Sequence, residues 1–168
     1  MRQLIVVAHD IRSAHNVGAL LRTADGLGVE RLFLTGHSPY PQTPGDPRLP
    51  HLASQQHRRI QKTALGAELS VKWEYHYQAK GVIERLSKEG YGIVGLEQTD
   101  RAEPLPSYRP PQRLALLLGN EISGLPVELL NLCHQIVHIP MSGTKESFNV
   151  AAAAAMALYH LRFTAKSK

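Results

Sequence analysis

Short runs of β-branched and leucine residues alternate along this chain with longer stretches of helical periodicity. Residues 4–8 and 31–35 have the composition of buried strands, and the amphipathic stretch 17–27 separates them. The same order continues with helical stretches near 78–88, 126–132 and 148–163, and with strands near 92–97, 114–118 and 135–140. Strands connected through helices pair in parallel. The sequence therefore predicts an α/β fold, with a mostly parallel sheet and helices on both faces.

The length of 168 residues predicts a single domain, 1–168. The longest apolar run, 150–159, is shorter than the roughly 18 residues that span a bilayer, and the run 4–8 is too short for a signal peptide. Cys133 is the only cysteine, which excludes an internal disulfide, and no Cys/His cluster has zinc-site spacing. We therefore expect a cytoplasmic protein in which Cys133 is buried.

Five prolines and few apolar residues mark the segment 36–56, which we interpret as one long loop. A loop of this length usually covers a binding site or is disordered. The segment 57–62 that follows is basic, and the whole chain has 19 Lys and Arg against 14 Asp and Glu, a formal net charge of +5. A polyanionic partner is compatible with this charge, but a basic segment can equally be a solvated surface.

Three consecutive predicted strands end in glycine and small polar residues, over 95–99, 118–126 and 139–149. Ligands of parallel sheets bind at this carboxyl edge, where backbone amides can contact them directly. The chain has no GxGxxG turn after its first strand and no GxxxxGK[ST] loop, which argues against dinucleotide and triphosphate cofactors. Its nine histidines are scattered without metal-site spacing. We therefore expect a metal-free site at this edge.

Several polar residues near the predicted strand ends have both a functional and a structural interpretation. Asn16 is a good first residue for the N-terminal helix, and Arg22 lies opposite that helix's apolar stripe. Taken alone, Arg22 could simply be solvated and Asn16 could be a plain cap. Glu121 could pair with a backbone amide, and Ser147 and Asn149 could cap the last helix.

The predicted last helix, 148–163, contains the run Ala151 to Ala155 followed by Met156, Ala157 and Leu158. It is apolar on every face for more than two turns, which excludes an ordinary surface helix of a monomer. Such a helix either lies deep in the fold or packs against a second subunit. We expect both, and hence a homodimer.

Three segments, in this order and spacing, resemble the SpoU (TrmH-type) family of SPOUT RNA methyltransferases. They are 16–24, with the sequence NVGALLRTA; 116–125, with LLLGNEISGL; and 139–143, with IPMSG, followed by SFNV at 147–150. The segment 62–68, KTALGAE, also resembles one that is common in this family. The similarity extends over nearly the whole chain.

This resemblance implies an α/β fold whose C-terminal part forms a deep trefoil knot, an exception to the rule that chains do not thread loops. It also implies that S-adenosyl-L-methionine binds, bent, in the knot loops of a homodimer whose active site takes residues from both subunits. By similarity, the residues that bind this cofactor are Leu96, Glu97, Gly119, Ile139, Met141, Ser147 and Phe148.

For catalysis, the resemblance assigns Arg22 to the ribose 2′-hydroxyl, with Asn16, Glu121, Ser147 and Asn149 organising the site. Arginine keeps its charge in proteins and is a poor general base. Two roles for Arg22 stay open: it accepts the hydroxyl proton, or it only binds the adjacent phosphate and fixes the hydroxyl. Alignment of the reacting atoms would then be the main catalytic contribution.

The resemblance implies an S-adenosyl-L-methionine-dependent RNA ribose 2′-O-methyltransferase. The single domain, without a separate RNA-binding domain, favours tRNA over ribosomal RNA as the substrate. The alternatives are an enzyme acting on ribosomal RNA and a non-catalytic RNA-binding protein that keeps the SPOUT fold. A doubly wound protein that binds another small nucleotide has less support, because the phosphate-loop signatures are absent.

Overall fold

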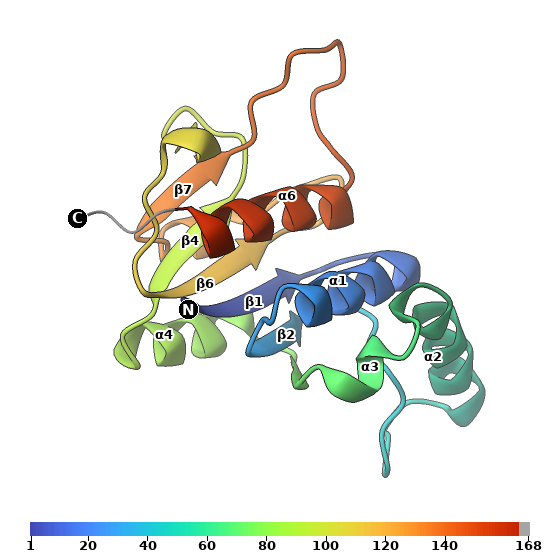
Figure 1. The fold of residues 1–168 in the computed structure, drawn as a ribbon. Helices are drawn as coiled ribbons and strands as arrows, with labels where there is room; N and C mark the ends of the chain where they lie inside the picture. Colours follow the sequence, from blue (N-terminus) through green and yellow to red (C-terminus); the bar gives the residue numbers. More distant parts are fainter. Residues whose placement is uncertain (165–168) are drawn as a thin grey trace.

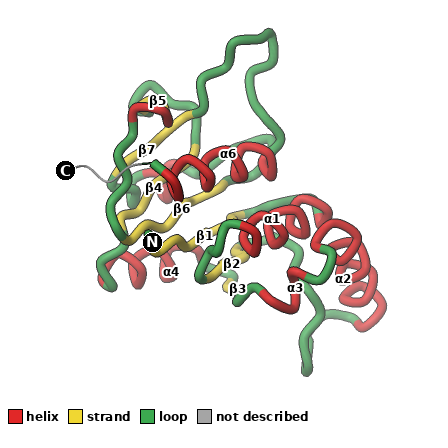
Figure 2. The backbone as a smooth tube through the Cα atoms, in the orientation of Figure 1, coloured by secondary structure: helices red, strands yellow, loops and turns green. Residues whose placement is uncertain are grey.

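The computed structural model describes residues 1–164, which form a seven-stranded sheet flanked by helices (Figures 1 and 2). All neighbouring strands are parallel, in the order β3-β2-β1-β6-β4-β7-β5. The strands are β1 (Gln3–His9), β2 (Arg31–Thr35), β3 (Trp73–His76), β4 (Gly92–Leu96), β5 (Glu103–Pro104), β6 (Arg113–Leu118) and β7 (Gln135–His138). The helices are α1 (Ala14–Gly26), α2 (Pro50–Ala64), α3 (Ala67–Ser70), α4 (Ala79–Lys88), α5 (Val127–Leu130) and α6 (Val150–Phe163), with a 3₁₀ turn at Leu105–Ser107.

The central strands β1 and β6 are buried on both faces, which explains their continuous apolar sequence. Along β1, Leu4 and Val6 point into the core under α1 and α6, whereas Ile5 and Val7 point into the core under α4 and α5. Alternate residues of a strand face opposite sides, so one short run supplies both cores. The predicted α/β fold with helices on both faces is confirmed.

The prediction of one loop over 36–56 is wrong at its C-terminal end, because α2 begins at Pro50. Proline is well tolerated in the first helical turn, where its missing N–H has no partner to lose. Only Ala53, Ile60 and Ala64 of α2 are buried, so the helix lacks a clear apolar stripe. The edge elements α3 and β3 were also not predicted.

Residues 36–49 form an ordered loop rather than a disordered one. The Arg48 guanidinium lies 3.5 Å from the ring centroid of Tyr40, and Tyr40 stacks on Tyr75 of β3 at 4.1 Å. Arg48 also donates to Asp46 Oδ1 at 2.8 Å and to Gln56 Oε1 of α2 at 2.6 Å. The hydrogen bonds from Arg48 keep the pKa of the Asp46 carboxyl well below its usual range.

Helices α1 and α2 pack closely around Gly18. A Cβ at this position would collide with the Ile60 carbonyl and the Thr63 hydroxyl. Thr63 Oγ1 also donates to the His15 carbonyl at 2.8 Å. The C-terminal half of α2 is therefore held against the N-terminal half of α1.

Candidate functional site

A cavity of about 180 Å³ lies at the carboxyl ends of β4, β6 and β7, where the N-terminus of α6 meets the sheet. Leu96, Ile139 and Phe148 are among its apolar residues, and its polar residues include Glu97 and Glu121. Residues 36–49 contribute nothing to its lining, so the loop there does not cover it as a lid. The three strand ends that carry glycine and small polar residues thus converge on one site, as predicted.

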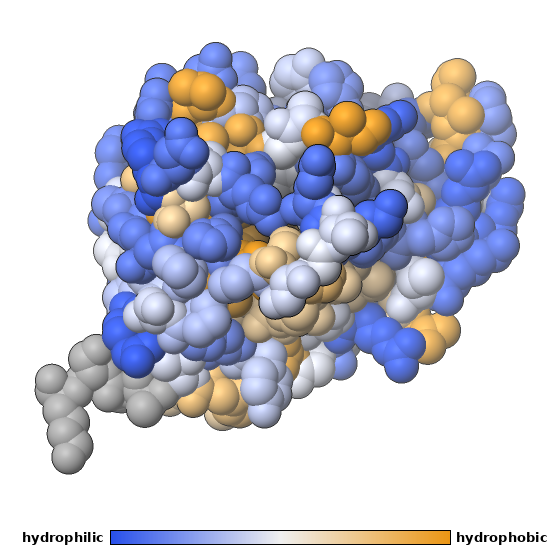
Figure 3. Space-filling view, turned by 90° about the horizontal axis from the view of Figure 1, so that it is seen from above, coloured by the Kyte–Doolittle hydropathy of each residue, from blue (hydrophilic) through white to orange (hydrophobic). Residues whose placement is uncertain are grey.

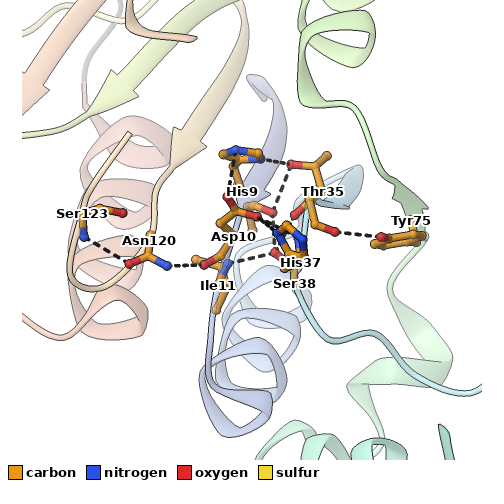
Figure 4. Close-up of polar contacts among 11 residues, drawn as sticks. His9, Asp10, Ile11, Thr35, His37, Ser38, Tyr75, Asn120 and Ser123 are labelled. Carbon is orange, nitrogen blue, oxygen red and sulfur yellow. Dashed lines mark hydrogen bonds and ion pairs between the residues drawn. The ribbon is translucent and has the colours of Figure 1, made fainter. Parts of the chain in front are cut away.

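Asn120 holds the loop that follows β6. Its side-chain carbonyl accepts the Ile122 and Ser123 amides at 2.9 and 3.1 Å, and its Nδ2 donates to the Asp10 carbonyl at 2.8 Å (Figure 4). Gly124 closes the loop with a backbone φ of 68°, a region that glycine adopts readily. The loop that carries Glu121 is therefore fixed to the end of β1.

Glu121 joins this loop to the start of α1. Its carboxylate accepts hydrogen bonds from the Arg12 amide at 2.9 Å, the Ser13 amide at 3.3 Å and Asn16 Nδ2 at 2.8 Å. Burial opposes ionisation of this carboxyl, but the hydrogen bonds outweigh burial and lower its pKa. Glu121 is therefore an ionised acceptor whose oxygens are occupied by the N-terminus of α1.

Asn149 extends this connection to α6. Its Nδ2 donates to Asn16 Oδ1 at 3.2 Å, while its own Oδ1 accepts the Ala151 amide at 2.9 Å and caps α6. Asn149, Asn16 and Glu121 therefore form a continuous polar chain, which we call the bridge. It links α6, α1 and the loop after β6 beside the cavity.

The prediction that Asn16 starts and caps the first helix is wrong. The cap is Ser13, whose Oγ accepts the Asn16 amide at 3.4 Å. Asn16 lies in the first turn, so its side chain is free to make the bridge. Both serine and asparagine cap helices well, and the sequence pattern alone does not distinguish them.

The remaining predicted site residues divide between the cavity and the outer surface. Ser147 and Phe148 line the cavity, as do the predicted cofactor residues Leu96, Glu97, Gly119 and Ile139, whereas Met141 does not. Arg22 is exposed on α1, six residues beyond Asn16, which is a little less than two helical turns. Its side chain makes no hydrogen bond or ion pair within residues 1–164, so a single chain does not bring it to the bridge.

The sequence interpretation did not include three residues that brace this edge of the sheet. Asn120 holds the β6 loop, and Ser13 contributes both a helix cap and an amide to Glu121. Asp10, with a backbone φ of 52°, accepts the His37 amide at 2.7 Å and lies 3.3 Å from the His9 ring (Figure 4). In the sequence, Asn120 lies directly between the predicted site residues Gly119 and Glu121. That position was the one sequence feature that could have pointed to its role.

His9 and His37 lie on either side of Asp10 at the ends of β1 and β2 (Figure 4). Burial lowers the pKa of His9, although the nearby Asp10 carboxylate partly opposes this shift.

No group of three or more metal-ligating side chains occurs among residues 1–164. In the same part of the chain, no helix has both the length and the apolar character needed to cross a membrane.

Comparison with known proteins shows which family this chain belongs to. The model of the SpoU rRNA Methylase family matches residues 3–159. The 23S rRNA (guanosine-2'-O-)-methyltransferase RlmB of Acinetobacter baylyi is 29% identical over 93% of this chain and 58% of its own length. The chain spans between 9 and 65% of the length of the first curated relatives that it matches.

Two solved structures share the fold. The SpoU methyltransferase AviRb of Streptomyces viridochromogenes, in complex with the cofactor AdoMet, has a TM-score of 0.77 and 26% identity over 95% of this chain and 56% of its own. A structure described as giving insights into the 2-OH methylation of C/U34 on tRNA has a TM-score of 0.72 and 27% identity, and covers 95% of this chain and 94% of its own. Since the family model matches almost the entire chain, this protein belongs to the SpoU rRNA methylase family.

Proposed function

We propose that this chain is an S-adenosyl-L-methionine-dependent RNA ribose 2′-O-methyltransferase. The observation that carries the proposal is the bridge of Asn149, Asn16 and Glu121 beside the cavity at the carboxyl ends of β4, β6 and β7. It brings three sequence segments that resemble family motifs to one place. The related AviRb structure contains AdoMet, and the related RlmB is named as a 2′-O-methyltransferase.

The cavity has the chemistry that a nucleoside-like methyl donor requires. Apolar side chains such as Leu96 and Ile139 can sandwich a base, while the strand-end backbone can hydrogen-bond its edge. The proposed cofactor residues are therefore Leu96, Glu97, Gly119, Ile139, Met141, Ser147 and Phe148. When bound, the donor supplies an activated methyl group with its own sulfonium leaving group, so the protein needs neither a metal nor a nucleophile.

In this mechanism the chain's own residues hold and orient the acceptor ribose. The carboxylate of Glu121 fixes Asn16, and Asn16 and Asn149 fix each other, so these hydrogen bonds restrict rotation of both amide groups. Ser147 lines the cavity, and its hydroxyl can hydrogen-bond the ribose. Arg22 would engage the 2′-hydroxyl or its neighbouring phosphate with a permanent positive charge.

A homodimer would complete this site. Ala152, Met156, Tyr159 and Phe163 follow a helical i, i+4, i+7, i+11 spacing and form an exposed apolar stripe on α6. Figure 3 shows hydrophobic residues gathered near the middle of the face seen from above. A second copy covering this stripe would bring its own α1 with it. Arg22, which is exposed in one chain, would then reach the partner's cavity.

The finer parts of the proposal concern topology and substrate. We propose that α6, which follows β7 yet packs beside α1 and β6, is threaded as a trefoil knot. We also propose that the single domain acts on tRNA in the cytoplasm. The relative of nearly equal length concerns tRNA, while the longer RlmB acts on 23S rRNA and supports ribosomal RNA as the alternative.

The experiment that tests this function is methyl transfer from labelled S-adenosyl-L-methionine into total tRNA and, separately, into ribosomal RNA. Nuclease digestion of each product then shows whether the label is on ribose or on a base. Ribose label in tRNA is the expected result, and ribose label in ribosomal RNA alone would correct the substrate. Donor binding without any transfer would instead favour a non-catalytic RNA-binding protein.

A further inference from the structure

Helix α2 presents a row of polar and basic side chains to solvent, which we call the stripe. His51, Gln55, Arg58 and Lys62 follow the spacing i, i+4, i+7, i+11, and all four are exposed. At 1.5 Å per residue this stripe runs for about 16 Å along one face of the helix. The exposed Arg59 flanks it, and the 15 residues of α2 include no aspartate or glutamate.

Among the residues that the structure describes, the cations of this stripe lack carboxylate partners, whereas four other cations have them. Arg31 and Arg85 both pair with Glu74, and Lys80 of α4 pairs with Glu84. By contrast, Arg58 donates only to Ser54 Oγ, at 2.8 Å. Within residues 1–164, neither Arg59 nor Lys62 makes an ion pair. Uncompensated like charges on one helix face repel each other, and a polyanion relieves this repulsion.

The stripe is rigidly placed relative to the candidate site. Helix α2 is held against α1 by the close approach at Gly18 and by the Thr63 hydrogen bond to His15. His15 directly precedes Asn16 of the bridge, and Lys62 directly precedes Thr63. Lys62 is therefore about one helix diameter, roughly 10 Å, from the start of the bridge. Figure 1 shows α2 flanking α1 at the outer side of the fold.

We propose that the α2 stripe, with Arg58, Arg59 and Lys62 as its cations, binds the phosphate backbone of the RNA whose ribose enters the site. This inference rests on the proposed function, and it adds the surface on which the substrate docks. Three cations within about one helical turn can meet neighbouring phosphates, and contacts of this type position a nucleic acid without reading its bases.

A membrane surface fits this helix less well than RNA does. Amphipathic membrane helices insert an apolar face between lipids. The apolar face of α2, formed by Ala53, Ile60 and Ala64, is already buried against the protein. Hydrophilic residues cover most of the right-hand flank in Figure 3, where α2 lies. Leu52 is the one large apolar side chain of α2 that is exposed, and a single leucine is a small apolar face for insertion between lipids.

The test compares two double variants that remove equal charge from opposite sides of the sheet. Arg58→Gln with Lys62→Gln neutralises the stripe. Lys80→Gln with Lys88→Gln is the matched control, because both residues are exposed on α4, which covers the other face. All four side chains are exposed, so both variants should fold. The dissociation constant of the full-length substrate RNA is measured over a series of salt concentrations, together with kcat and donor binding.

We expect the α2 variant to weaken RNA binding by about 5-fold per lost phosphate contact at 0.1 M salt, or about 25-fold for the pair. Its log–log salt slope should become shallower by about 0.7 per contact. Values of kcat at saturating RNA and of donor affinity should stay at the wild-type level, and the α4 control should bind RNA as the wild type does.

Unchanged RNA affinity and salt slope in the α2 variant would overturn the docking surface. Equal weakening by both double variants would also overturn it, because net charge rather than the stripe would then control binding. Failure of the proposed function would look different: wild-type protein would transfer no methyl group to RNA that it binds.

Discussion

Asn149 Nδ2 donates to Asn16 Oδ1 at 3.2 Å and so joins residues that are 133 positions apart in the sequence. The same Asn16 donates to Glu121, and Asn149 caps α6. This hydrogen bond therefore couples the start of α1 to the start of α6, the helix that lines the cavity. The two ends of the bridge can be tested separately. The contribution of the ionised Glu121 depends on pH, whereas that of the neutral asparagines does not.

Replacing Asn16 by alanine should remove both bridge contacts at once. A hydrogen bond to a charged group contributes about 1.5–3 kcal/mol, but Asn16 is only partly buried, so we expect a loss of about 1 kcal/mol in the free energy of unfolding. Methyl transfer should fall by about 10²-fold, since misplaced acceptor groups reduce rates on this scale. Urea denaturation and the transfer assay measure the two effects.

The matched control for this variant is Asn131→Ala, because Asn131 is exposed at the end of α5 and its side chain makes no hydrogen bond within residues 1–164. It should alter the unfolding free energy by less than about 0.5 kcal/mol and leave activity unchanged. Equal losses in the two variants would show that the bridge has no special role.

Glu121 should make the protein's stability depend on acid pH. Its folded-state pKa is lowered, so it contributes stability that is fully present above its unfolded value, about 4.5, and is lost as pH falls through the folded value. Glu121→Gln lacks this contribution. The difference in unfolding free energy between wild type and variant should therefore be constant above about pH 5.5 and shrink below pH 4.5.

Unfolding by urea between pH 3 and 7 measures this difference for the two proteins side by side. Subtracting the variant cancels the contributions of the other carboxyls with lowered pKa values, such as Asp46 and Glu74. A difference that stays constant down to pH 3 would mean that the hydrogen bonds from α1 do not stabilise the ionised carboxylate.

Gly18 and Gly81 offer a pair of substitutions with opposite expected signs. Both lie in helices, where alanine is favoured over glycine by about 1 kcal/mol. A Cβ at Gly81 meets nothing within 4 Å, so Gly81→Ala should stabilise the protein by up to about that amount. A Cβ at Gly18 collides with backbone and side-chain atoms of α2, so Gly18→Ala should destabilise it by about 1–3 kcal/mol.

Chemical denaturation of both variants measures these shifts. Gly18→Ala should also reduce RNA binding if the α2 stripe must sit beside α1, whereas Gly81→Ala should not affect it. Stabilisation by both substitutions would mean that α2 moves away without cost, and the close packing at Gly18 would then be unimportant.

The central sheet was predictable because strands buried on both faces must be continuously apolar, as in residues 4–8 and 114–118. Helix α2 was not predictable from the sequence. It is held in place by its three buried side chains, by the close approach at Gly18 and by the loop that Arg48 anchors. These are tertiary interactions that leave little local periodicity. An apolar pattern reports burial, and α2 is mostly exposed.

The candidate site was predictable to the level of its segments but not of its contacts. Glycine and small polar residues at three strand ends pointed to the edge of the sheet where the cavity lies. Whether Ser13 or Asn16 caps α1 depends on where Glu121 lies in space, more than 100 residues away. No local rule contains that information, so the bridge required the structure.

Mixed dimers test whether Arg22 acts on the partner's cavity. One chain carries Arg22→Ala and keeps its bridge, and the other carries Asn16→Ala and keeps its arginine. If each site combines the cavity of one subunit with Arg22 of the other, the mixed dimer has one intact site and one doubly damaged site. Its activity should then be about half that of the wild-type dimer, although each parent dimer is nearly inactive. If Arg22 serves its own chain, both sites of the mixed dimer are damaged and no activity returns.

Differently tagged chains, co-expressed and purified through both tags, provide the mixed species, and light scattering confirms that it is a dimer. Tyr159→Glu, which places a charge in the apolar stripe of α6, should yield monomers that transfer no methyl group, because each cavity then lacks the partner's arginine.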